Sequence, residues 1–257
     1  CIATLQDLVL GGYANAVIVS QGSRRKYRLA DHAMQDRFSL TNDALENVIK
    51  AISYPRLSKY RQYGGNDNRK AYHLYRWNTG LSQHLYLPIQ AWEIAYRNAL
   101  AGFLHWKYGS DWPYDARLQR QLGREENAKL ATAIDRQRQQ RSVQRPETGQ
   151  IVADLTSGFW VALLSKRYEI PFALRPGGNL RRIFPSSGPL SRAHAWERMN
   201  NLRDLRNRIA HHEPIFHLDL DKRWCELQEA LAWLCTDSAF AVRHACAFEA
   251  LWANRPV

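Results

Sequence analysis

The spacing of apolar residues predicts helices from about position 43 onward and shows no alternation typical of strands. Four apolar residues at the start of this region recur at helical intervals on one face: Leu45, Val48, Ile49 and Ile52. Asp43 and Glu46 are spaced like a capping box in front of them. Residues 68–108 keep the same period and predict one long helix, bent near Pro88 and stopped at Gly109.

The rest of the chain predicts shorter helices separated by turns. These helices cover residues 116–141, 150–168 and 191–212, a segment from Asp219 or Asp221 to about 234, and residues 238–252. Residues 142–149 predict a short loop, and the Pro- and Gly-rich residues 170–189 predict a long one. We therefore expect an all-α helical bundle in which residues 41–257 form a single domain.

The first 40 residues are poorly patterned, and we interpret them as an N-terminal extension. The chain begins with Cys1 and has its first methionine at Met34, which fits a fragment or a reading frame extended upstream of a true start at Met34. The four cysteines form no CxxC pair, which indicates free thiols in a reducing compartment. No stretch approaches the roughly 20 apolar residues of a membrane span. We therefore expect a cytoplasmic protein that does not enter a membrane.

The charge of the chain points to a polyanionic partner. A formal net charge of +12 favours nucleic acid, although a solvated basic surface is the alternative. Between Arg117 and Arg145, eight basic residues stand against three acidic ones, a local surplus of five. Six arginines of this segment are candidate RNA contacts: Arg117, Arg120, Arg124, Arg136, Arg138 and Arg141. A solvated helix face explains the same segment equally well.

The segment Leu205–Phe216 carries the residues with the clearest chemistry. Asn207 and His211 are four positions apart, so a helix places them on one face, and the long side chain of Arg206 can reach the same space. RNA carries its own nucleophile, the 2′-hydroxyl, and a neutral histidine can accept its proton. An arginine can hold the phosphate and balance the charge that builds on its oxygens. This set can cut RNA without a metal or another cofactor.

Two other interpretations of these residues stay open at this point. Arginine, asparagine and histidine near a helix end can simply cap it, because cations meet the negative end of the helix dipole there. A metal site formed by His211, His212 and His217 is the other, although no carboxylate or cysteine completes a known ligand spacing. The pattern of residue types alone does not choose among catalysis, capping and metal binding.

A family resemblance favours catalysis. The pattern Arg206-Asn207-x-x-x-His211 resembles the R-N-x-x-x-H form of the HEPN ribonuclease motif, and its extension to Phe216 is similar to the A-H-H-E-x-x-F block of Abi-like (abortive infection) proteins. Four further blocks resemble that family in the same order: Ile52–Tyr60, Leu74–Ser82, Glu93–Ala99 and Leu155–Trp160. The resemblance covers about residues 43–235.

The resemblance implies a HEPN-like bundle with additional helices and a metal-independent endoribonuclease that acts as a phage-defence toxin. It also implies a homodimer whose two motifs face each other, with RNA as substrate and an antitoxin or regulatory RNA as a further partner. Arg206 and His211 are then the catalytic pair, and Asn207 supports them. His212 is a supporting residue, as are three residues of one upstream block: Glu93, Arg97 and Asn98.

Each of these assignments has a competing interpretation. Glu93 and Arg97 are four positions apart and can form a plain ion pair along one helix. A catalytically silent HEPN module that binds RNA or a partner protein is the main alternative for the whole chain, and a purely structural bundle is the third. The intact pair of Arg206 and His211 favours the enzyme over the silent module. The net charge favours either nucleic-acid function over the structural bundle.

Overall fold

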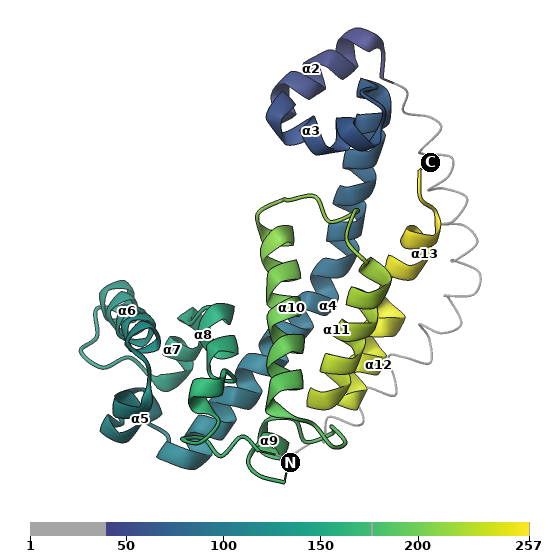
Figure 1. Ribbon diagram of the computed structural model, residues 1–257. Coiled ribbons are helices and arrows are strands. Elements are labelled where there is room, and N and C mark those ends of the chain that lie inside the picture. Colours follow the sequence, from purple (N-terminus) through teal and green to yellow (C-terminus); the bar gives the residue numbers. More distant parts are fainter. Residues whose placement is uncertain (1–39, 176, 257) are drawn as a thin grey trace, which may run out of the picture. The chain divides into compact units, whose positions relative to one another are not determined.

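The computed structural model describes residues 40–175 and 177–256 (Figure 1). Within these ranges the chain forms twelve α-helices and two 3-10 helices and has no strand, so the predicted all-α class is confirmed. The chain divides into two compact units, Cys1–Ser58 and Lys59–Val257. The interpretation of residues 1–40 as an extension, with its suggested start at Met34, falls almost entirely outside the described residues.

The first unit contains helix α2 (Asn42–Ile52) and the start of α3 (Tyr54–Tyr63). The N-cap of α2 is Thr41, whose hydroxyl accepts a hydrogen bond from the Ala44 N–H at 3.2 Å. The predicted capping box at Asp43 was therefore wrong: Asp43 lies inside the first turn, where a carboxylate favours the positive end of the dipole. The predicted apolar face is correct, since Leu45 and Ile49 are buried.

The second unit is built on the long helix α4 (Asn68–Tyr108), whose bounds match the prediction. Asp67 begins it by accepting the N–H groups of Arg69 and Lys70 at 2.7 and 2.9 Å. Gly109 ends it with a φ of 93°, which a residue with a Cβ rarely adopts. One face of α4 is buried along most of its length: Leu81, Leu85, Ile89, Trp92, Tyr96, Leu100 and Phe103.

Four helices after residue 190 complete the core of this unit: α10 (Arg192–Ala210), α11 (Leu220–Leu234), α12 (Thr236–Ala245) and α13 (Phe248–Ala253). Figure 1 shows α10 and α11 side by side and lying against α4. The Trp92 indole donates to the Met199 sulfur at 3.2 Å, which joins α4 to α10 inside the core. The single helix predicted over 238–252 is in fact two, because Cys246 is extended between α12 and α13.

Shorter elements surround the far half of α4: η1 (Trp112–Tyr114), α5 (Ala116–Gln121), α6 (Arg124–Arg141), α7 (Thr148–Asp154), α8 (Ser157–Ala162), η2 (Lys166–Tyr168) and α9 (Leu180–Ile183). The helix predicted over 116–141 is broken at Gly123, whose N–H donates to the Tyr168 hydroxyl at 2.9 Å. That hydroxyl in turn donates to the buried Glu126 at 2.8 Å. A contact across the fold thus overrides the local helical pattern.

The helix predicted over 150–168 is also interrupted. Leu155 and Thr156 are extended, so α7 and α8 meet at an angle, and η2 follows α8 after a turn. The apolar residues continue on both sides of the break, which hides it from an analysis of periodicity. Residues 170–189, predicted as a loop, contain the short helix α9 with Leu180 and Ile183 buried. In the part of the chain that the structure describes, no helix is both long and apolar enough to cross a membrane.

Candidate functional site

The predicted motif lies at the C-terminal end of α10, which closes in a Schellman turn. The His212 N–H donates to the Ile209 carbonyl at 3.0 Å, and the Glu213 N–H donates to the Arg208 carbonyl at 2.8 Å. Arg208 and Glu213 also form an ion pair at 3.1 Å. These two positions usually make an apolar contact in such a turn. The helix therefore ends before His211, which is its C-cap.

His212 occupies the left-handed position of the turn, with a φ of 56°. Glycine is the usual residue there, because a side chain with a Cβ costs about 1–2 kcal/mol in this conformation. His211, by contrast, has a φ of −91° and no such strain. Backbone strain of this kind is often found at functional sites, which makes the His212 side chain a candidate for a functional role.

We expect the His212→Gly variant to be at least as stable as the wild type, and up to about 1 kcal/mol more stable, because glycine relieves the left-handed strain. The matched control is His211→Gly, which gains nothing from glycine and should lose about 0.5–1 kcal/mol. Thermal unfolding followed by circular dichroism measures both. A clear loss of stability in His212→Gly would show that contacts of the imidazole, rather than the turn, determine this position.

The chain beyond the turn is fastened to α4 by Asn78. This residue is 4% exposed, and its side-chain carbonyl accepts the N–H groups of Ile215 at 2.7 Å and Phe216 at 3.1 Å. The Phe216 ring stacks on Tyr60 with a centroid distance of 5.2 Å. The turn that carries both histidines is consequently held between α10 on one side and a buried anchor on the other.

Replacing Asn78 by alanine should lower the free energy of unfolding by about 2–4 kcal/mol, since it leaves two buried N–H groups without an acceptor. The matched control is Asn98→Ala on the same helix, where the side chain is exposed and the change should stay within about 0.5 kcal/mol. Urea unfolding of the two variants is the measurement. Equal midpoints for Asn78→Ala and the wild type would contradict the anchoring role.

Arg206 is held by an ion pair across two helices. Its Nε lies 3.0 Å from Oε2 of Glu93 on α4, and the two side chains are 37% and 26% exposed. Glu93 thus pairs with Arg206 on another helix, and not with Arg97 four positions along its own helix. Because the bond engages Nε, the two terminal nitrogens of the guanidinium stay available for a ligand.

Two adjoining hollows lie on either side of this ion pair, and Glu93 and Arg206 line both. We call the first the arginine pocket; it has a volume of about 680 Å³ and is lined by Arg97, Arg203, Arg206 and Asn207 with the turn between α7 and α8. We call the second the histidine pocket; it has a volume of about 560 Å³ and is lined by His212 with Ile209 and residues of α4. The ion pair is therefore the boundary between two ligand-sized spaces.

The structure gathers most of the predicted site residues, but not all of them. Residues on the arginine pocket are Arg97, Arg206, Asn207 and Glu93, and His212 lies on the histidine pocket. His211 is exposed on the turn and lines neither hollow, although its N–H donates to the Asn207 carbonyl at 2.9 Å. Asn98 is exposed on α4 and also lines neither hollow.

Among the lining residues that sequence reasoning missed, three lie on the arginine pocket beside the predicted ones: Arg203, Tyr86 and Gln90. Helical spacing contained the signal for all of them. Arg203 precedes Arg206 by three positions on α10, while Gln90 and Tyr86 precede Glu93 by three and seven on α4. Residues at these intervals share a helix face, so extending each block backwards by one or two turns would have identified them.

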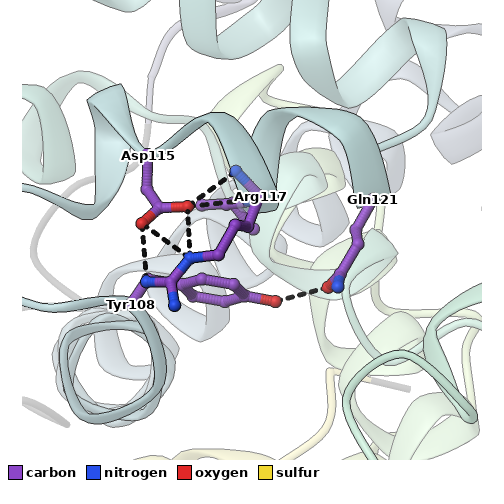
Figure 2. A network of polar contacts seen from close by, with 5 residues as sticks. Tyr108, Asp115, Arg117 and Gln121 are labelled. Carbon is purple, nitrogen blue, oxygen red and sulfur yellow. Dashed lines mark hydrogen bonds and ion pairs between the residues drawn. The ribbon is translucent and has the colours of Figure 1, made fainter.

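Arg117, a candidate RNA contact, is part of a local clamp (Figure 2). Asp115 accepts from its Nε and Nη2, the latter at 2.8 Å, and the guanidinium lies 5.7 Å from the centre of the Tyr108 ring. The bound guanidinium lowers the pKa of Asp115 to about 2. Burial raises the pKa of Tyr108, whose hydroxyl donates to Gln121, to about 12. Arg117 therefore fastens the start of α5 to the end of α4.

Ion pairs reduce the basic surplus of the segment from Arg117 to Arg145. Five of its eight basic residues pair with a carboxylate: Arg117 with Asp115, Lys129 with Glu125, Arg136 with Asp154, Arg138 with Asp135 and Arg145 with Asp111. Three of these acids lie outside the segment, so eight basic residues face six acids and the surplus of five falls to two. Arg120 and Arg124 are exposed, and Arg141 donates to Gln137 at 3.1 Å. RNA contact along this segment stays a prediction.

His217 contacts Lys59 of α3 and lines neither hollow. Lys59 donates to its Nε2 at 2.8 Å, which requires that nitrogen to be unprotonated. Burial, with Lys59 and Arg208 nearby, lowers the pKa of His217 below its usual value. Among the residues that the structure describes, no group of three His, Cys, Asp or Glu side chains could hold a metal ion, and the three histidines considered above form no such group.

The site combines a partly exposed arginine, an amide and one histidine around two hollows with a second histidine, His211, exposed on the adjoining turn. Residues of these types can hold a phosphate and transfer protons. Comparisons with protein-family models, with curated proteins and with solved structures found no match to this chain. The resemblance to HEPN proteins consequently rests on the sequence blocks, and the geometry of the site carries the functional argument.

Proposed function

We propose that the chain is a metal-independent endoribonuclease of the HEPN type, which acts in the cytoplasm as an abortive-infection toxin against phage. The observation that supports it best is Arg206, held by Glu93 between two hollows and one turn before His211. A guanidinium fixed through one nitrogen is oriented for a phosphate on its other two. The turn that ends the same helix carries two imidazoles, groups that can accept and donate protons.

In the proposed reaction the 2′-oxygen of a nucleotide attacks the adjacent phosphorus while the bond from phosphorus to the 5′-oxygen breaks. An imidazole accepts the proton of the 2′-hydroxyl, and a proton is donated to the departing 5′-oxygen. Arg206 balances the charge that develops on the phosphate oxygens. Asn207, on the same pocket, orients the phosphate, and the products are a 2′,3′-cyclic phosphate and a 5′-hydroxyl.

A homodimer would complete such a site. The reaction needs a proton acceptor and a proton donor, and His211 is an exposed residue that a second copy could approach. We expect static light scattering at micromolar concentration to give about twice the chain mass of 29.8 kDa. A strictly monomeric protein with full activity would contradict this arrangement.

The second candidate is a catalytically silent module that binds RNA or a partner protein. It is favoured by the position of His211, which lines neither hollow within one chain. In that case Arg206 and the arginine pocket bind RNA, and no group transfers a proton. An antitoxin or regulatory RNA is a proposed partner of either form.

A cleavage assay on a random pool of single-stranded RNA separates the two candidates. Purified protein is incubated with the pool in excess EDTA, and the new 5′ ends are sequenced. We expect cuts that accumulate with time and that a metal chelator does not prevent. An intact pool, with protein that is folded and still binds RNA, would reject the enzyme in favour of the silent module.

A further inference from the structure

The arginine pocket contains a cation that the protein itself does not balance. The side chain of Arg97 lines the pocket, and its Nε is buried without a hydrogen-bond partner. Within residues 40–175 and 177–256 the structure shows no ion pair for Arg97 either. Burying a charged donor without an acceptor costs stability, and such a group calls for an unseen partner such as an ion or a ligand. An anion can reach the Arg97 guanidinium through the pocket.

The acidic residues of the pocket are already paired. Glu93 binds Arg206 at 3.0 Å, and Asp154 binds Arg136 at 3.1 Å, so neither compensates Arg97. Arg203, the other basic residue on this wall, pairs with its exposed neighbour Asp204, and an exposed pair of this kind is weak. Three arginines line the pocket, and of its two acids Glu93 pairs with one of them, Arg206, while Asp154 pairs with Arg136, which does not line the pocket. Arg97 and Arg203 therefore leave the pocket with an excess of positive charge.

Two walls of the pocket are joined by a buried hydrogen bond, and the lining offers further groups that suit a nucleotide. The Tyr96 hydroxyl, next to Arg97 on α4, donates to the Trp160 carbonyl at 3.0 Å and fixes α4 to α8. Thr156 and Asn207 add a hydroxyl and an amide to the lining. Tyr86 is 60% exposed and lines both hollows, so its ring is a platform on which a base can stack.

We infer that the arginine pocket binds a backbone phosphate of single-stranded RNA through Arg97 and Arg203, with the neighbouring base stacked on Tyr86. The strand then passes Arg206 into the histidine pocket, because the two hollows share that residue. The inference rests on the proposed function only in taking RNA as the ligand. A free nucleotide offers the same phosphate chemistry and is the competing source.

The test measures the binding of an RNA that cannot be cleaved. A fluorescent single-stranded RNA with every 2′-hydroxyl methylated keeps the phosphates and bases and lacks the nucleophile. Its affinity is measured by anisotropy at several salt concentrations for the wild type, Arg97→Gln and Arg203→Gln. The control is Arg181→Gln, which removes the same charge from an exposed site on α9. Melting temperatures of all four proteins exclude unfolding as the cause of any loss.

We expect Arg97→Gln and Arg203→Gln each to weaken binding by about ten- to a hundredfold, the effect of losing one charge-assisted contact. Each should also reduce the slope of log affinity against log salt by about 0.7, as one lost phosphate contact on a single strand does. Arg181→Gln should leave the slope unchanged. Slopes of Arg97→Gln and Arg203→Gln equal to that of the wild type would overturn the inference, even if the wild type cuts RNA.

A second arm identifies the source of the phosphate. Adenosine monophosphate is titrated against the bound fluorescent RNA. Displacement only at concentrations far above the dissociation constant of the RNA supports the strand as the ligand, because a mononucleotide lacks the contacts that the rest of the strand makes. Displacement by the mononucleotide at concentrations below the dissociation constant of the RNA would assign the pocket to a free nucleotide and overturn RNA binding there, provided that Arg97→Gln abolishes this displacement. If methylated RNA binds as expected but natural RNA is not cut, the inference stands and the proposed enzyme fails.

Discussion

His211→Ala is expected to slow RNA cleavage by about a hundred- to ten-thousandfold, the usual contribution of proton transfer by a positioned side chain. His211 is the exposed C-cap of α10, and its backbone N–H bond to Asn207 does not depend on the side chain. The variant should therefore fold normally, with a loss confined to the rate. Single-turnover rates on one labelled RNA give the comparison.

The control for this variant is His73→Ala, which removes an exposed histidine from α4 that lines neither hollow. It should cleave RNA at the wild-type rate. Adding free imidazole to His211→Ala should restore part of the activity if the missing function is proton transfer. Wild-type rates in His211→Ala would remove this residue from the mechanism and leave His212, on the histidine pocket, as the candidate base.

Arg206→Ala should cost roughly 3–4 kcal/mol of transition-state stabilisation, the effect of removing one donor aimed at developing charge. Arg206→Lys should recover little, because lysine keeps the charge but loses the planar fork that holds Glu93 and, in the proposed mechanism, a phosphate. Stability should change far less, since the pair is partly exposed and such pairs contribute little to folding. The measurements are single-turnover rates and thermal unfolding of the same protein samples.

Glu93→Gln tests whether Glu93 only positions Arg206 or takes part in the reaction itself. It removes the partner that orients Arg206 and leaves the arginine in place. We expect a rate between those of the wild type and Arg206→Ala. A Glu93→Gln enzyme as slow as Arg206→Ala would instead indicate that Glu93 itself takes part in the chemistry.

The elements that the sequence could predict are those whose ends are set locally. Helix α4 follows its prediction from Asn68 to Tyr108, because Asp67 caps it directly and Gly109 ends it with a positive φ that other residues rarely adopt. The end of α10 was placed two residues too late, since the Schellman turn there uses a histidine where glycine is usual. The ends of α4 were predictable from local capping residues, whereas the end of α10 was not, because a histidine occupies the turn position where glycine is the usual signal.

Contacts between distant residues explain what the sequence could not show. The break at Gly123 depends on Tyr168, and the arrangement of the site depends on Glu93 and Arg206, which are 113 positions apart. The family blocks placed Glu93, Arg97, Asn98 and Asn207 near Arg206, and all of them except Asn98 line the arginine pocket. Helical spacing alone could not reveal which carboxylate would hold Arg206. Counting charges within a sequence window also overstated the basic surplus, because Asp111 and Asp154 lie outside the window and pair with arginines inside it.

The role of the RNA 2′-hydroxyl is the central chemical claim, and one substrate comparison tests it. An RNA that the wild type cuts at one mapped position is compared, in excess EDTA, with the same RNA carrying a single 2′-deoxynucleotide on the 5′ side of that position. The proposed mechanism predicts a 2′,3′-cyclic phosphate end on the first RNA and no cut at that position in the second. Equal cutting of both substrates, or a fragment that ends in a free 3′-hydroxyl, would contradict it.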